Sequence, residues 1–194
     1  MKKILAMLLA LVMVLSLAAC ASTQPAAEPV ASSDAPAESG KTYTVGVCQL
    51  VQHEALDAAT QGFVDALKDE LGDAVTIDVQ NASGDSVNCG TIVNSFVSKG
   101  VDLIMANATP ALTAAVSATA DIPILGTSIT AYGVALDIDD FNGTVGGNVS
   151  GTSDLADLQA QAQMILDWFP ETKTVGLLFC SAEPNSRYQI DEVR

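Results

Sequence analysis

The sequence is poor in the side chains that enzymes most often use for acid–base chemistry and metal binding. Its 194 residues contain a single histidine, His53, and neither a Gly-x-Ser-x-Gly motif nor the ligand spacing of a zinc site accompanies it. These absences argue against a hydrolase or a zinc enzyme. By position alone, His53 is best interpreted as a loop residue at the start of a helix. We therefore expect no catalysis, no metal and no cofactor.

Basic residues are also scarce. Lysine and arginine number 8 against 23 aspartates and glutamates, which gives a formal net charge of −15. A chain this acidic is not expected to bind nucleic acid or to dock on a membrane through a basic patch. Both arginines, Arg187 and Arg194, lie at the end of the sequence, so an anion bound elsewhere would have to be held by hydroxyl and amide groups.

The first residues have the pattern of an export signal. Lys2 and Lys3 precede an apolar run over residues 4–19, which is too short for a comfortable transmembrane helix. The run ends in Leu-Ala-Ala before Cys20, which matches a lipobox, where the cysteine is acylated and the chain is cut ahead of it. We expect a signal peptide over residues 1–19 and a lipid on Cys20 that holds the protein at the extracytoplasmic face of the cell membrane. An uncleaved anchor with an incidental cysteine is the alternative.

Residues 20–41 are expected to form a flexible tether, because alanine, serine, proline, glutamate and threonine offer too little apolar surface to repay ordering. Short apolar runs and helical stretches then alternate, which is typical of βαβ units and a parallel sheet. We expect residues 42–147 to form a first α/β ligand-binding lobe. Residues 148–194 are expected to form a hinge crossing and the start of a second α/β lobe.

The predicted strands of the first lobe lie at 43–48, 75–79, 103–106, 122–125 and 133–138. Its predicted helices cover 54–71 and 86–98, and a third opens with Thr109 as cap and Pro110 in the first helical position. Alternation in residues 75–79 indicates a strand near a sheet edge, whereas residues 103–106, apolar on both faces, indicate a central strand.

In the second lobe, an amphipathic helix over 155–166, a buried strand at 174–179 and the start of a helix at 186 are expected. A lone strand cannot make a sheet, and a compact domain usually needs on the order of 100 residues. We therefore expect the sequence to be truncated in its second lobe.

Loops that follow the predicted strands contain small polar residues. The four loops are 49–54, 81–85, 107–110 and 126–130. Open α/β sheets bind ligands at the carboxyl ends of their strands. There, the hydroxyls of Thr109, Thr127 and Ser128 beside free N–H groups would suit a carboxylate, and Glu183 would suit an amine, so an amino-acid zwitterion fits both. Each hydroxyl could equally well cap a helix, but their gathering along one edge favours binding.

Three cysteines remain beyond Cys20, namely Cys48, Cys89 and Cys180. They are spaced too widely for a zinc motif and are odd in number. One disulfide is possible outside the cell, but the sequence does not say which cysteines would pair. Because all three lie in or beside apolar segments, we expect small buried apolar residues.

Five stretches occur in an order and at a spacing that resembles a known family, the ABC-transporter substrate-binding lipoproteins of the tryptophan/tyrosine type. These stretches are 47–57, 81–85, 106–111, 148–154 and 181–186. The resemblance implies two Rossmann-like, doubly wound lobes of the type I periplasmic-binding-protein kind, the second incomplete here. It also implies capture of an amino acid, typically aromatic, and its delivery to an ABC permease driven by a cytoplasmic ATPase.

The ligand-binding residues expected from the loops and the resemblance are Gln49, His53, Asn81, Thr109, Thr127, Ser128, Asp154, Glu183 and Asn185. Either Glu183 or Asn185 would bind the ligand amine. The chain departs from the family pattern at Glu54, where proline is common, and at Ala131-Tyr132, where Asp-Pro is common. A sensory lipoprotein that presents the same bilobal domain to a membrane kinase or receptor is the alternative function.

Overall fold

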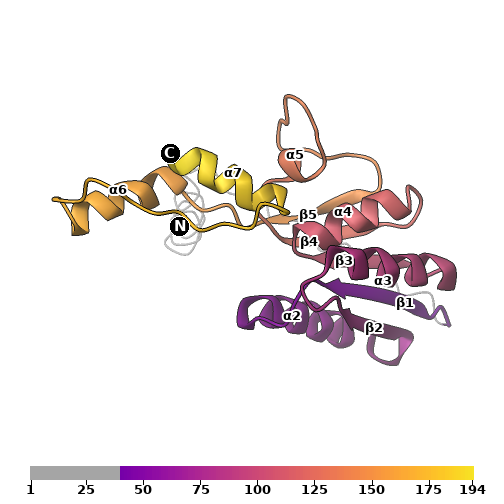
Figure 1. Cartoon of the computed structure of the whole chain (residues 1–194). Helices are drawn as coiled ribbons and strands as arrows, with labels where there is room; N and C mark the ends of the chain where they lie inside the picture. Colours follow the sequence, from indigo (N-terminus) through magenta and orange to yellow (C-terminus); the bar gives the residue numbers. More distant parts are fainter. Residues whose placement is uncertain (1–39) are drawn as a thin grey trace, which may run out of the picture. The chain divides into compact units, whose positions relative to one another are not determined.

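A parallel five-stranded sheet forms the centre of the computed structural model, which describes residues 40–194 (Figure 1). The strand order is β2-β1-β3-β4-β5. The strands are β1 (Tyr43–Gln49), β2 (Val75–Asn81), β3 (Leu103–Asn107), β4 (Ile124–Ile129) and β5 (Val149–Ser153). The predictions of a signal peptide, of lipidation at Cys20 and of a tether over residues 20–41 lie outside the described residues, except for Gly40 and Lys41 at the end of the tether.

The order of the strands confirms the sequence-based assignment of edge and centre. The strand β2 lies at the edge of the sheet with a half-exposed burial pattern, whereas β3 is central and almost wholly buried. A strand covered on both faces must be apolar on both, which explains the unbroken Leu-Ile-Met-Ala run of β3.

Helices connect the strands and continue beyond them. They are α2 (Glu54–Leu71), the short 3-10 helix η1 (Gly72–Ala74), α3 (Ser86–Lys99), α4 (Thr109–Ala118), α5 (Tyr132–Ala135), α6 (Leu158–Trp168) and α7 (Pro184–Val193). The helix α2 ends where its sequence predicts, at Gly72, whose φ of 54° is easily adopted by glycine alone. Within residues 40–194, none of these helices has the length and apolar character needed to cross a membrane.

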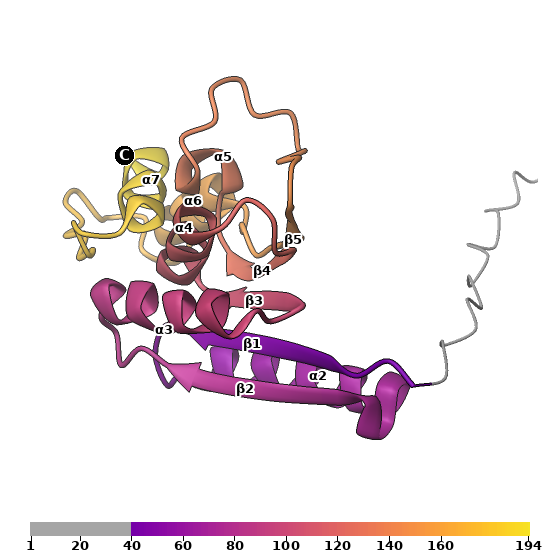
Figure 2. The ribbon, with the colours of Figure 1, turned by 90° about the vertical axis from the view of Figure 1, so that its right-hand side faces the viewer.

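The sheet lies between two helical layers (Figure 2). On one face, Val45, Val47 and Met105 pack with Phe63 and Leu67 of α2. On the other face, α3 and α4 pack side by side and enclose the larger core, which includes Cys48, Cys89, Val93, Phe96, Ile104 and Leu112. The alternation of side chains along β1 therefore divides its residues between the two layers.

A buried tyrosine holds β5 against β4. The Tyr132 side chain at the start of α5 is 7% exposed, and its hydroxyl lies 3.0 Å from the carbonyl oxygen of Gly126 in β4 and 3.3 Å from that of Thr152 in β5. Burial raises the pKa of Tyr132 to about 12, so the hydroxyl stays a hydrogen-bond donor at neutral pH. The fifth strand thus depends on a side chain from outside the sheet.

Two strand predictions are wrong. Residues 133–138 were expected to form the fifth strand, but they contain most of the short helix α5. The fifth strand is β5, at the start of the segment 148–194 where a hinge crossing was expected. The strand β5 is exposed along most of its length and is held by backbone pairing with β4. Its sequence therefore lacks the apolar pattern from which a strand can be predicted.

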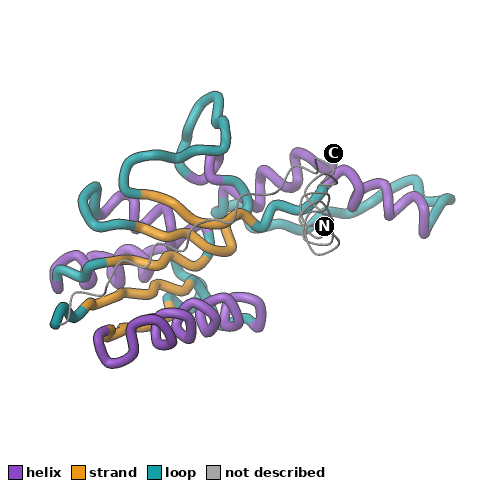
Figure 3. Tube along the Cα trace, turned by 180° about the vertical axis from the view of Figure 1, so that it is seen from behind, coloured by secondary structure: helices purple, strands orange, loops and turns teal. Residues whose placement is uncertain are grey.

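The strand predicted at 174–179 does not form either, and Figure 3 shows a loop along the whole connection between α6 and α7. Its side chains from Thr174 to Leu178 are exposed, and Leu178 is 99% exposed. Within the described residues, no strand pairs with this segment, so its backbone has no ladder to join. The helix α7 forms as predicted and contacts α5 and α6.

Candidate functional site

Polar side chains occupy the carboxyl ends of four neighbouring strands. The register pairs Gln49 of β1 with Asn81 of β2 on one side and with Asn107 of β3 on the other, and Asn107 is paired in turn with Thr127 of β4. The four loops singled out from the sequence therefore lie along one edge of the sheet, as predicted. Ligands of open α/β sheets bind at this edge.

A buried hydrogen-bond network connects β1, β3 and α2 at this edge. The Gln49 amide nitrogen donates to the carboxylate of Asp57 at 2.6 Å, and its oxygen accepts a hydrogen bond from the Thr60 hydroxyl at 2.6 Å. The amide nitrogen of Asn107 donates to the Thr60 oxygen at 2.9 Å and to the Leu56 carbonyl at 2.8 Å. Because a carbonyl can only accept, the Leu56 contact fixes which end of the Asn107 amide is nitrogen.

Two buried polar atoms beside this network lack a partner. They are Oδ1 of Asn107 and Oγ1 of Thr109, on residues that are 0% and 1% exposed. Between them, Ala108 has a φ of 90°, which is strained for a residue with a side chain. Unpaired buried polar groups are rare and cost roughly 1–3 kcal/mol each. At this edge of the sheet, the β3–α4 turn is therefore the part whose polar groups most clearly lack hydrogen-bond partners.

Asn107 was not among the residues predicted to bind ligand, although its loop was. The sequence did contain a signal for Asn107, because it is the single polar residue at the end of an otherwise apolar central strand. A polar side chain that is buried there needs hydrogen-bond partners. Gln49 was predicted to contact ligand, and in the structure both ends of its amide are engaged within the protein.

The amino end of α4 differs from the amino ends of its neighbours. Side chains cap α2 and α3, since His53 accepts from the Ala55 N–H and Asp85 accepts from the Val87 N–H. No side chain caps α4. The prediction that Thr109 caps this helix is wrong by one position, because Ala108 is the cap residue and Thr109 begins the helix. The first turn of α4 thus presents uncapped N–H groups beside the unpaired Thr109 hydroxyl.

The other predicted residues of the first lobe lie at or just after the carboxyl ends of β2, β4 and β5. The side chain of Asn81 closes a turn by accepting from the Ser83 N–H at 2.8 Å. Thr127 and Ser128 are half-buried at the end of β4, and Ser128 has a φ of 55°. Asp154 is exposed just after β5.

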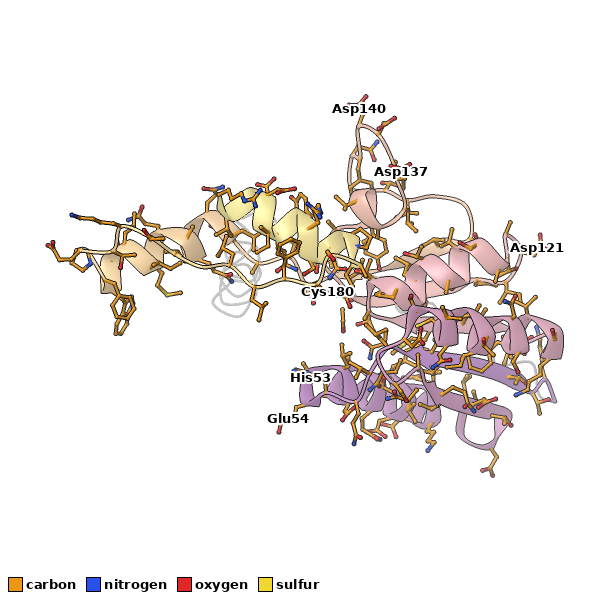
Figure 4. All side chains as sticks on the ribbon, viewed as in Figure 1. His53, Glu54, Asp121, Asp137, Asp140 and Cys180 are labelled. Atoms are coloured by element: carbon orange, nitrogen blue, oxygen red, sulfur yellow. The ribbon has the colours of Figure 1, made fainter. Side chains whose placement is uncertain are left out.

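His53 is exposed at the amino end of α2 (Figure 4), and its Nδ1 lies 3.2 Å from the Ala55 nitrogen. The interpretation of His53 as a loop residue that begins a helix is therefore correct. We expect His53→Ala to lower the free energy of unfolding by about 1 kcal/mol through loss of the cap. Urea denaturation would measure this change, and His53→Asn, which restores a capping oxygen, should recover most of it. Equal stability of the alanine variant and the wild type would contradict the capping role.

The predicted residues of the second lobe lie at the start of α7. Glu183 is half-buried at the cap position of that helix, and Oδ1 of Asn185 is buried without a partner. Glu183 also lines a cavity of about 400 Å³, together with Pro184, Cys180, Pro110 and Thr113. Of the predicted ligand-binding residues, this cavity includes Glu183 alone, but Leu50, Gly84 and Pro110 also line it and belong to three of the four strand-end loops.

No group of three or more histidine, cysteine, aspartate or glutamate side chains within residues 40–194 is arranged to hold a metal ion. What the edge offers chemically is hydrogen bonding, from the uncapped N–H groups of α4, the Thr109 hydroxyl and the carbonyl oxygen of Asn107. This is the chemistry of recognition of a small polar molecule, with donors for an anion and an acceptor for an N–H group.

Residues 44–194 match the model of a known protein family, described as ABC transporter substrate binding protein. The chain belongs to the ABC transporter substrate-binding protein family. The match covers nearly all of the described residues, including the strand-end loops and the start of α7. Family membership confirms the resemblance drawn from five short stretches of sequence.

Relatives of this substrate-binding protein include one named tyrosine-binding protein, from Clostridioides difficile (strain R20291). It is 35% identical over 198 residues, which cover 99% of this chain and 56% of the relative. A solved Streptococcus domain in complex with L-Trp is 36% identical with a TM-score of 0.72, over 79% of this chain and 52% of that one. A ligand-free, open substrate-binding protein from Clostridium difficile is 39% identical with a TM-score of 0.60, over 77% and 52%. The chain therefore spans about half the length of these relatives.

Proposed function

We propose that this protein captures an aromatic amino acid outside the cytoplasm and delivers it to the permease of an ABC importer, while a lipid on Cys20 keeps it at the membrane. The family supplies the substrate-binding role. The relatives named for tyrosine and solved with L-Trp favour an aromatic amino acid. The signal-like sequence before Cys20 supports export and anchoring.

The observation that carries this proposal is the β3–α4 turn. An uncapped helix amino end favours negative charge, because its N–H groups point outward and the helix dipole is positive there. The Thr109 hydroxyl adds a donor without a partner in the protein. We assign the ligand carboxylate to this turn, with Thr127 and Ser128 of the neighbouring β4 end beside it.

The ligand amine is assigned to the start of α7. Glu183 provides a carboxylate and Asn185 provides a buried amide oxygen that lacks a partner. An ammonium group donates three hydrogen bonds and would be attracted by both. Because the first lobe contains no arginine, N–H and hydroxyl groups bind the ligand carboxylate in this proposal, whereas Glu183 and Asn185 bind the amine. The two ends of the ligand thus have different partners, which gives the ligand a single orientation.

Ligand analogues test this assignment. Tyramine and tryptamine keep the ring and the amine of tyrosine and tryptophan but lack the carboxylate, so we expect them to bind the full mature protein about 100-fold more weakly. Calorimetric titration would measure the difference. Equal affinity for an amino acid and its decarboxylated amine would contradict a carboxylate site at α4.

The Thr109→Val variant tests the same site from the protein side. Valine keeps the shape and removes the hydroxyl, so the affinity for the amino acid should fall by about tenfold while tyramine binding stays unchanged. Ser98→Ala is a control for the loss of a helix hydroxyl away from the site, because Ser98 lies at the far end of α3 and its hydroxyl donates to the Asn94 carbonyl. Unchanged amino-acid affinity in Thr109→Val would remove Thr109 from the site.

A further inference from the structure

Two of the three cysteines, for which the sequence did not indicate a pairing, face each other between the sheet and α3. Cys48 of β1 and Cys89 of α3 are both 0% exposed and belong to the same core cluster. The alternation of β1 explains the direction of Cys48, since its neighbour Val47 packs in the α2 layer. Cys180, by contrast, is exposed near the start of α7 (Figure 4), so the prediction that all three cysteines are buried is wrong for this one.

The packing of Phe96 on Gly46 sets the position of α3 along β1. A Cβ atom at Gly46 would lie 2.5 Å from the Phe96 ring, so the ring rests directly on the strand backbone. Cys89 lies two helical turns before Phe96, or roughly 10 Å along α3. Cys48 lies two residues after Gly46, or roughly 7 Å along β1. Because a crossover helix runs antiparallel to its strands, both displacements point the same way and bring Cys89 over Cys48 in the same core cluster.

The electrostatics of the pair agree with this geometry. The facing Cys89 thiol, together with burial, raises the pKa of Cys48. Burial and the neighbouring sulfur both disfavour the charged thiolate form of Cys48. Both thiols are fully buried in the folded core and out of reach of an oxidant, so the chemistry of this pair takes place before α3 has packed on the sheet.

We propose that Cys48 and Cys89 form a disulfide that ties the first turn of α3 to the end of β1. In the reaction, the thiolate of one cysteine attacks a disulfide of an oxidant, either oxidised glutathione or a thiol oxidoreductase, and the second cysteine then displaces the oxidant's sulfur. One S–S bond forms in the protein, two protons and two electrons leave its thiols, and the oxidant is reduced to two thiols. The bond forms as the exported chain folds and is shielded afterwards.

The position of this bond gives it a role at the candidate site. Cys48 directly precedes Gln49, whose amide belongs to the network that orients Asn107. A covalent link at Cys48 would hold the carboxyl end of β1 against α3 one residue from that network. It would therefore limit the motion of the sheet edge whether or not a ligand is bound.

Peptide mapping tests the proposal directly, because trypsin separates the three cysteines. Cleavage after Lys41, Lys68, Lys99, Lys173 and Arg187 places Cys48 in residues 42–68, Cys89 in 69–99 and Cys180 in 174–187. The full chain, secreted into an oxidising compartment, is alkylated while denatured and is digested without reduction. We expect peptides 42–68 and 69–99 to be joined, and 174–187 to carry the alkyl label.

The melting temperature tests whether the proposed disulfide stabilises the fold. Reduction in denaturant followed by refolding should lower the melting temperature of the wild type and of Cys180→Ser by about 10 °C, since the bond closes a loop of roughly 40 residues. The double variant Cys48→Ala/Cys89→Ala should not respond to reduction. Alkylation of both buried cysteines before reduction, or a link from either one to peptide 174–187, would overturn the proposal.

Discussion

Replacing Gly151 by alanine is expected to lower the free energy of unfolding by about 3 kcal/mol. Gly151 has a φ of 150°, a conformation that residues with a side chain rarely adopt. An added Cβ would also collide with the Gly126 carbonyl oxygen of β4 and with the Tyr132 hydroxyl that donates to it. Both effects would push β5 away from the sheet, and urea denaturation would measure the loss.

Gly62→Ala is the matched control for this substitution. Gly62 lies on the exposed face of α2, where nothing lies within 4 Å of an added Cβ. Alanine is a better helix former than glycine, so this variant should gain about 0.5–1 kcal/mol. A Gly151→Ala protein that unfolds at the same urea concentration as the wild type would show that β5 does not depend on the Tyr132 contact.

Thr60→Val is expected to lower both the free energy of unfolding, by about 3 kcal/mol, and the affinity for the amino acid, by about tenfold. The Thr60 hydroxyl donates to the Gln49 amide oxygen and accepts from the Asn107 amide nitrogen, so valine would leave the Gln49 oxygen without a partner and remove one of the two hydrogen bonds of Asn107. The Asn107 amide would then be held by the Leu56 carbonyl alone. Denaturation and calorimetric titration of the same preparation would measure the two effects.

Thr60→Ser separates the hydrogen bonds from the packing. Serine keeps the hydroxyl and loses one methyl group, which should cost about 1 kcal/mol of stability with no change in affinity. If the serine and valine variants bind the ligand equally well, the network does not orient the site.

The sequence predicted the first lobe well because its elements follow simple periodic patterns. The strand β3 is apolar on both faces, and α2 has regular spacing of its apolar residues between His53 and Gly72. The strand β5 could not be predicted this way, because backbone pairing with β4 and the Tyr132 contact hold it in place rather than apolar side chains. At 174–179 the apolar pattern indicated a strand, but a strand also requires a partner, which sequence periodicity does not supply.

The sequence predicted correctly that the four loops share one edge of the sheet, because parallel strands that follow one another in βαβ units end at the same edge. Ligand binding at this edge stays a prediction. The strained Ala108, the uncapped α4 and the orientation of the Asn107 amide depend on tertiary contacts between β1, β3 and α2. Such contacts join residues far apart in the sequence, so no local pattern reports them.

The central claim is that the protein binds an aromatic amino acid, and calorimetric titration of the full mature protein with each of the common amino acids tests it most directly. We predict saturable heat at a stoichiometry of one for L-tyrosine or L-tryptophan, and much weaker binding of the small aliphatic amino acids. The same titration with the Thr109→Val variant should show a tenfold loss of affinity. Absence of heat with every amino acid would contradict the claim.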